Sequence, residues 1–89
     1  MTEISLPSIV VLGRDTCDDT VRSRALLARR RIAHTYLKVD EDPAADAWIR
    51  SLNEGGWRTP TIVIGDRDRP DEILREPSDE ELLAALGLV

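Results

Sequence analysis

The residues with the clearest chemical potential lie at positions 14–20, which read RDTCDDT and include the only cysteine of the chain. Cys17 lies where a predicted strand passes into a predicted helix, and unpaired backbone N–H groups at a helix start stabilise a thiolate, the reactive form of cysteine. Arg14 can add a positive charge there, and Thr20, one helical turn later, can donate a hydrogen bond to the sulfur. The segment predicts a reactive thiol, and the alternative is a buried, inert cysteine.

Three carboxylates, those of Asp15, Asp18 and Asp19, flank this cysteine and act against its ionisation. Acidic side chains in a first helical turn stabilise the helix. The same charges within ~4–6 Å of a thiolate raise the pKa of the thiol, whereas helix N–H groups and Arg14 lower it. The sequence alone leaves this balance open, and with it the reactivity of Cys17.

The composition limits the class of protein. The 89 residues are 42% hydrophobic and 33% charged, which predicts a single domain over residues 1–89 with one modest core. A net charge of −5 argues against nucleic acid as a partner. One cysteine excludes an internal disulfide and a cysteine-rich zinc site, so we expect no bound metal. The N-terminal stretch MTEISLPSIVVLG contains neither a signal peptide nor a membrane span, so we expect a cytoplasmic protein without a membrane partner.

Hydrophobic patterning predicts the elements that must position the thiol. Short apolar runs predict strands over 8–13, 33–39 and 61–65, and a fourth strand over 72–76. Helical spacing predicts helices over 18–31 and 43–53, and a last helix after a capping box formed by Ser78 and Glu81. The order β-α-β-α-β-β-α predicts an α/β fold, with parallel pairing of strands separated by helices and an antiparallel hairpin at the end.

The first helix is predicted to bury one stripe of apolar side chains. Its members follow helical spacing and are Val21, Ala25, Ala28 and Ile32, with Leu26 and Leu27 widening the stripe.

Pro60, in the segment RTPT directly before the third predicted strand, is a second candidate for the site. Proline is permitted at a strand entrance. Trp57, three residues earlier, has two interpretations that the sequence does not separate. It either flanks a cleft as a contact for a ligand or merely covers a loop.

These residues, in this order of elements, resemble the glutaredoxin branch of the thioredoxin fold, and within it the actinobacterial mycoredoxin-like proteins. The resemblance implies a thioredoxin-like, glutaredoxin-type fold with a four-stranded mixed sheet flanked by three helices. It also implies a thiol–disulfide oxidoreductase that reduces protein mixed disulfides with a low-molecular-weight thiol. The matching segments are IVVLGRDTCDDTVRSRALL, KVDEDPAADAWI, SLNEGGWRTPTIVIGD and EPSDEELLAALG.

The resemblance also implies the catalytic residues. Cys17 takes the place of the nucleophilic cysteine, and Arg14 stands where the family usually has a basic residue near the thiol. Thr20 stands where dithiol members have the resolving cysteine. With no second cysteine, the implied mechanism uses Cys17 alone.

A binding site for the small thiol is implied as well, with Arg14 and Trp57 beside the cysteine. Pro60 matches the family's cis-proline, and the backbone of Thr59 would pair with the peptide-like part of the thiol. Ser78 and Asp79 match the region that binds the far end of the thiol.

The implied co-substrate is mycothiol or glutathione, with no tightly bound cofactor, and we expect a monomer whose partners are proteins carrying mixed disulfides. The chain departs from the family pattern at Asp18 and Asp19, in place of a proline or glycine plus an aromatic, and at Arg58-Thr59-Pro60, in place of Thr-Val-Pro. Two alternatives remain: a non-catalytic or redox-sensing thioredoxin-fold module, and a dimer binding a [2Fe–2S] cluster. The acidic pair argues against the cluster.

Overall fold

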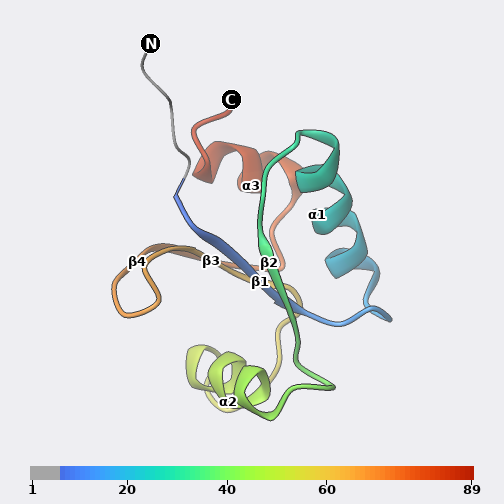
Figure 1. The fold of residues 1–89 in the computed structure, drawn as a ribbon, viewed down its shortest axis with the longest axis vertical. Helices are drawn as coiled ribbons and strands as arrows, with labels where there is room; N and C mark the ends of the chain where they lie inside the picture. The colour runs from blue at the N-terminus through green and yellow to red at the C-terminus, as the bar shows by residue number, and fades with distance from the viewer. Residues whose placement is uncertain (1–6) are drawn as a thin grey trace.

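The computed structural model describes residues 7–89, so the expectation for the N-terminal stretch rests partly on residues outside them. The described elements form one four-stranded sheet in the order β2-β1-β3-β4. Figure 1 shows α1 and α3 together on one face of this sheet and α2 on the other. The predicted element order is confirmed, and the elements are β1 (Ile9–Gly13), α1 (Asp18–Arg29), β2 (Thr35–Lys38), α2 (Pro43–Leu52), β3 (Thr61–Gly65), β4 (Pro70–Arg75) and α3 (Asp79–Ala85).

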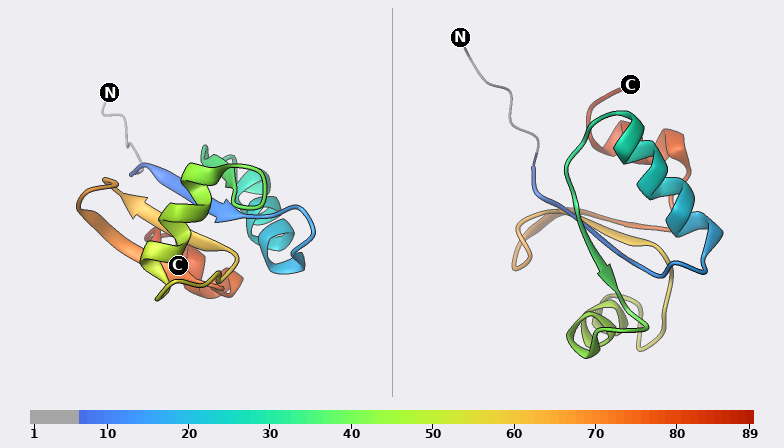
Figure 2. Two further views of the ribbon diagram at one scale, coloured as in Figure 1. Left: turned by 90° about the horizontal axis from the view of Figure 1, so that it is seen from below. Right: turned by 45° about the vertical axis from the view of Figure 1, so that its right-hand side comes forward.

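The two central strands, β1 and β3, are buried on both faces and divide the interior into two cores. Successive side chains of a strand point to opposite faces. Val11 and Ile62 therefore join the core under α1 and α3, while Leu12 and Val63 join the core over α2. Figure 2, seen from below, shows α2 lying across the sheet. The continuous apolar run over residues 8–13 is typical of a strand that is covered on both faces.

The direction of β3 differs from the prediction. Parallel pairing was expected for strands separated by helices, and it holds for β1 and β2 but not for β3, which is antiparallel to β1. The chain leaves the sheet at Val39, beside Gly13, and returns to it at Thr61, beside Leu12. Both points lie at the same end of β1. The loop after α2 carries the chain back, and helical periodicity contains no information about that return. The β3–β4 hairpin is antiparallel as predicted.

The buried face of α1 also differs from the predicted stripe. Val21 is 52% exposed and Ala28 is exposed, whereas Thr20 and Ser23 are each only 1% exposed. The reason is the close approach of α1 to the end of β1. A Cβ atom built on Gly13 would lie 2.5 Å from the Thr20 Cγ2, so only small side chains fit between the helix and the strand. The helix therefore turns its small polar side chains inward, together with Leu26 and Leu27.

Side-chain caps fix the starts of the other two helices. Asp42 accepts hydrogen bonds from the Ala44 and Ala45 N–H groups at 3.0 and 3.3 Å, directly before Pro43. The predicted capping box at the start of α3 is confirmed, with reciprocal Ser78–Glu81 hydrogen bonds of 2.9 and 3.1 Å. Within residues 7–89 no helix has the length and hydrophobicity needed to cross a membrane.

Candidate active site

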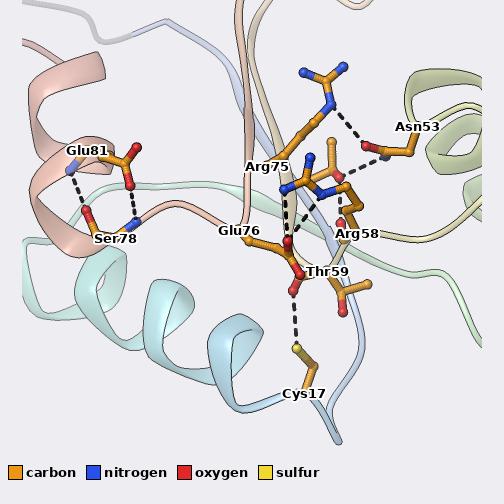
Figure 3. A network of polar contacts seen from close by, with 9 residues as sticks. Cys17, Asn53, Arg58, Thr59, Arg75, Glu76, Ser78 and Glu81 are labelled. Carbon is orange, nitrogen blue, oxygen red and sulfur yellow. Dashed lines mark hydrogen bonds and ion pairs between the residues drawn. The ribbon is translucent and has the colours of Figure 1, made fainter.

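Cys17 is the N-cap residue of α1 and is half-buried. An N-cap serine, threonine or aspartate normally accepts a hydrogen bond from the N–H groups of the first turn. Cys17 makes no such bond as a thiol. Its Sγ instead donates to the carbonyl oxygen of Thr59, at 3.3 Å (Figure 3). The first-turn N–H groups are therefore available to a thiolate.

The pKa of Cys17 is lowered from its ordinary value. Burial, the largest single influence, raises this pKa, but hydrogen bonds to the thiolate together outweigh it. The donors are the side chains of Thr59 and Thr20 and the backbone N–H groups of Thr20 and Asp19. The Thr20 hydroxyl is buried and has no partner beside the neutral thiol. Ionisation of Cys17 supplies that missing acceptor, which favours the thiolate.

The three flanking aspartates do not reverse this shift, because two of them are engaged by basic groups. Asp15 accepts hydrogen bonds from Lys38 at 3.0 Å and from Tyr36 at 2.9 Å. Both bonds lower the pKa of the Asp15 carboxyl, and the bond from Lys38 has the larger effect. Asp19 contacts Arg22 at 2.9 Å. Asp18 is exposed to solvent. The sequence left open whether the acids or the hydrogen-bond donors dominate at Cys17. In the folded chain the donors dominate, and the pKa of the thiol is lowered.

Alkylation of Cys17 by iodoacetamide is expected to show a pH midpoint below that of the same protein unfolded in urea. Only the thiolate reacts, so the rate rises with pH through the pKa, and a lowered pKa moves this rise to lower pH. Thr20→Val removes one donor to the thiolate and is expected to raise the midpoint. Thr35→Val, on the exposed side of edge strand β2, is the matched control and should not move it. A folded midpoint at or above the unfolded one would contradict this account.

Arg14 lies in the cysteine loop, and its carbonyl oxygen accepts a hydrogen bond from the Cys17 N–H at 3.2 Å. Its guanidinium carbon lies 5.9 Å from the centroid of the Trp57 ring. This contact places the Arg14 charge beside the tryptophan. The two predicted binding residues therefore lie together.

Trp57 is 36% exposed and is held by α2. Its Nε1–H donates to the Asp46 carboxylate at 2.7 Å, and Arg50 lies 5.4 Å from its ring centroid. The tryptophan lines a pocket of about 390 Å³ together with Val39, Asp40, Glu41, Asp42, Pro43, Asp46 and Arg50. Four carboxylates and one guanidinium make this pocket predominantly acidic. Trp57 thus lies in the wall of a pocket, in agreement with the first of its two interpretations, whereas the other lining residues were not predicted as site residues.

Thr59 and Pro60 lie opposite the cysteine, directly before β3. The Thr59–Pro60 peptide bond is cis, as the family resemblance implied. Both residues are buried, and the Thr59 carbonyl is the group that accepts the Cys17 hydrogen bond. Figure 3 shows the Arg58–Glu76 ion pair beside this segment, with an Nη2–Oε2 distance of 3.0 Å.

The segment that leads into α3 contains Ser78 and Asp79, and Arg22 joins this segment to the cysteine helix. The Arg22 Nε donates to Asp79 at 3.3 Å, and its Nη2 donates to the Pro77 carbonyl at 2.7 Å. Arg22 was not among the site residues predicted from the sequence. Its spacing of three residues from Asp19 predicts a local ion pair, but the bonds to α3 cross 55 and 57 residues and have no local signal. Within residues 7–89 no three or more His, Cys, Asp and Glu side chains group to hold a metal ion.

A mixed four-stranded sheet with helices on both faces, and a thiol at the start of its first helix opposite a Thr–Pro segment, defines a thioredoxin-fold thiol protein. The family model described as Glutaredoxin matches residues 9–68, and the chain belongs to the glutaredoxin family. Family membership and fold support a function of the thiol–disulfide oxidoreductase type.

Two solved structures are similar to this chain. One is the crystal structure of a glutaredoxin from Archaeoglobus fulgidus, with a TM-score of 0.69 and 18% identity over 88% of this chain and 84% of that one. The other is the solution structure of a glutaredoxin from Brucella melitensis, with a TM-score of 0.65 and 21% identity over 97% of this chain and 87% of that one. They confirm the predicted glutaredoxin-type fold. None of the curated proteins matches this chain in sequence.

Proposed function

We propose that this protein reduces mixed disulfides between proteins and a low-molecular-weight thiol by a one-cysteine mechanism. The observation that carries the proposal is the environment of Cys17. Its thiol is half-exposed at a helix start, and donors from Thr20 and Thr59 lower its pKa. We further propose that it acts as a monomer in the cytoplasm, where reduced small thiol is available to regenerate it.

The reaction consists of two thiol–disulfide exchanges. The Cys17 thiolate attacks the small-thiol sulfur of a protein mixed disulfide. The bond to the target protein's sulfur breaks, the target leaves as a thiolate that takes up a proton, and a disulfide joins Cys17 to the small thiol. The thiolate of a second small-thiol molecule then attacks the small-thiol sulfur of this disulfide. Cys17 leaves as a thiolate again, and the two small-thiol molecules depart joined by a disulfide.

The residue at position 20 restricts the protein to this route. A resolving cysteine there would attack the Cys17 mixed disulfide from within, but a threonine hydroxyl cannot form a disulfide. The Thr20 side chain is only 1% exposed and lies against Gly13. In this proposal Thr20 stabilises the Cys17 thiolate both before the first exchange and as the leaving group of the second.

Charge favours mycothiol over glutathione as the small thiol. Glutathione carries two carboxylates and one ammonium group, whereas mycothiol is a neutral, polyhydroxylated thiol. The pocket at Trp57 contains Asp40, Glu41, Asp42 and Asp46 against one arginine, so it repels an anionic arm and offers acceptors to hydroxyl groups. The wall of this pocket at Trp57 adjoins Arg14, in the cysteine loop.

The test is turnover of a peptide mixed disulfide with each small thiol in turn. We expect kcat/KM to be about tenfold higher with mycothiol. Added salt should raise the rate with glutathione and leave the rate with mycothiol unchanged, because screening reduces only the charge repulsion. Mass spectrometry of the reacting enzyme should detect Cys17 joined to one small-thiol molecule. Absence of turnover with both thiols, while Cys17 is intact, would rule out the proposed function.

A further inference from the structure

Arg22 is a single side chain that connects the cysteine helix with the start of α3. Its three nitrogen atoms all have partners. Nη1 contacts Asp19 at 2.9 Å, Nη2 donates to the Pro77 carbonyl at 2.7 Å, and Nε donates to Asp79 at 3.3 Å. Asp19 lies three residues earlier on α1, while Pro77 and Asp79 come from the other end of the chain.

These partners belong to the starts of two helices, α1 and α3. Cys17 is the N-cap of α1, and residues 77–79 lead into α3, where the family resemblance implies that the far end of the small thiol binds. On the side that faces the sheet, the two helices share one apolar core, to which α1 contributes Leu26 and Leu27. Arg22 adds a directional link on the solvent side, because a guanidinium presents its donors in a fixed, planar arrangement.

Arg22 also compensates a charge next to the thiol. The charged side chains on the elements around Cys17 include Arg14, Asp15, Asp18, Asp19, Arg22, Arg24, Lys38, Arg58, Glu76 and Asp79. Lys38 neutralises Asp15, and Glu76 neutralises Arg58. Arg22 forms ion pairs with both Asp19, in the first turn of α1, and Asp79, at the start of α3.

We propose that Arg22 is a positioning residue for the exchange reaction, which fixes residues 77–79 against α1 and compensates the Asp19 carboxylate beside Cys17. The inference rests on the proposed function, because its effect on binding requires that the small thiol also reaches the start of α3, as the family resemblance implies. It predicts two separable effects. Loss of the charge acts on the ionisation of Cys17, and loss of the link acts on binding of the small thiol.

The experiment compares Arg22→Ala, Arg22→Lys and the double variant Arg22→Ala/Asp19→Asn. Arg22→Ala should lower the rate of Cys17 alkylation at pH 7 about threefold, because an uncompensated Asp19 disfavours the thiolate. It should also raise the KM for mycothiol severalfold with a smaller change in kcat, and speed hydrogen exchange at the amides of Ser78 and Asp79. Arg22→Lys should recover the alkylation rate but not the KM.

The double variant separates the two effects. Removal of both charges should restore the alkylation rate to that of the parent protein, while the KM and the amide exchange remain altered. Arg75→Ala is the matched control. Arg75 likewise donates to a side-chain oxygen and a backbone carbonyl, of Asn53 and Leu52, but on the α2 side of the sheet. It should change none of these readouts.

Arg22→Ala with an unchanged alkylation rate, KM and amide exchange, or with changes no larger than those of Arg75→Ala, would overturn the inference. The alkylation and amide-exchange readouts need no turnover. If the parent protein fails to turn over any mixed disulfide, the proposed function fails, and these two readouts still decide whether Arg22 positions residues 77–79 and compensates Asp19.

Discussion

Cys17→Ser is expected to abolish turnover of a mixed disulfide, lowering kcat/KM by at least about a thousandfold. The serine hydroxyl is not ionised at neutral pH and cannot form a disulfide, so the first exchange has no nucleophile. No other described residue can take over, because Cys17 is the only cysteine of the chain. The measurement is the steady-state rate with mycothiol and a peptide mixed disulfide.

The same substitution is expected to leave the fold intact and to make it slightly more stable. Serine is a preferred N-cap residue, whereas Cys17 makes no side-chain capping bond. The serine hydroxyl can accept a hydrogen bond from the first-turn N–H groups and can also donate to the Thr59 carbonyl. We expect the free energy of unfolding in urea to increase by about 0.5–1 kcal/mol. Lost activity with an unfolded protein, or retained activity, would contradict this prediction.

Cys17→Ala completes the comparison. Alanine also removes the nucleophile, so activity should be lost equally, but alanine is a poor N-cap residue. Its free energy of unfolding should therefore fall below that of Cys17→Ser. If serine and alanine variants are equally stable, the first-turn N–H groups do not reach the side chain at position 17.

Gly13→Ala is expected to destabilise the protein by about 1–3 kcal/mol through overpacking. A Cβ atom at this position would lie 2.5 Å from the Thr20 Cγ2 and 2.6 Å from its Oγ1, closer than any real contact. Thr20 is buried and β-branched, so it has few alternative rotamers, and either the helix or the strand must move. Urea unfolding followed by circular dichroism measures the loss.

A double-mutant cycle assigns this loss to one contact. Thr20→Ala removes both of the atoms that clash, so Gly13→Ala should cost much less in the Thr20→Ala background than in the parent protein. Gly56→Ala is the control, because a Cβ there meets only the Asn53 carbonyl oxygen, at 3.7 Å, and should change stability by less than about 0.5 kcal/mol. Equal costs of Gly13→Ala in both backgrounds would show that the strain does not arise at Thr20.

This close contact also connects the core with the chemistry of the site. The Thr20 hydroxyl is one of the donors that lower the pKa of Cys17. A side chain at position 13 that displaces Thr20 should therefore raise the pH midpoint of Cys17 alkylation, in the same direction as Thr20→Val. The absence of a side chain at Gly13 thus allows both the packing of α1 and the placement of the hydroxyl.

The sequence predicted those features that depend on neighbours along the chain. Alternating and helical periodicity gave the order of elements, and Ser78 with Glu81 gave the start of α3. The strand-to-helix transition around residue 17 placed the cysteine at a helix N-terminus. Each of these depends on local backbone preferences and on burial patterns that a short window contains.

Features that depend on distant partners were predicted poorly. The direction of β3 follows from the path of the loop after α2, which no periodicity encodes. The inward turn of Thr20 and Ser23, in place of Val21, follows from how closely α1 approaches Gly13. The bond between Arg22 and the start of α3 joins residues whose proximity exists only in the folded chain.

The reactivity of the thiol shows the same division. The sequence by itself determined that Cys17 lies among helix donors, one arginine and three acids, because all of these are its neighbours in the chain. Only the tertiary structure decided the balance between them. Lys38 and Tyr36 come from β2 to engage Asp15, Arg22 engages Asp19 while bound to α3, and Thr59 comes from the start of β3 to the sulfur. Electrostatic and hydrogen-bond energies depend on distances in space, and the folded chain sets those distances.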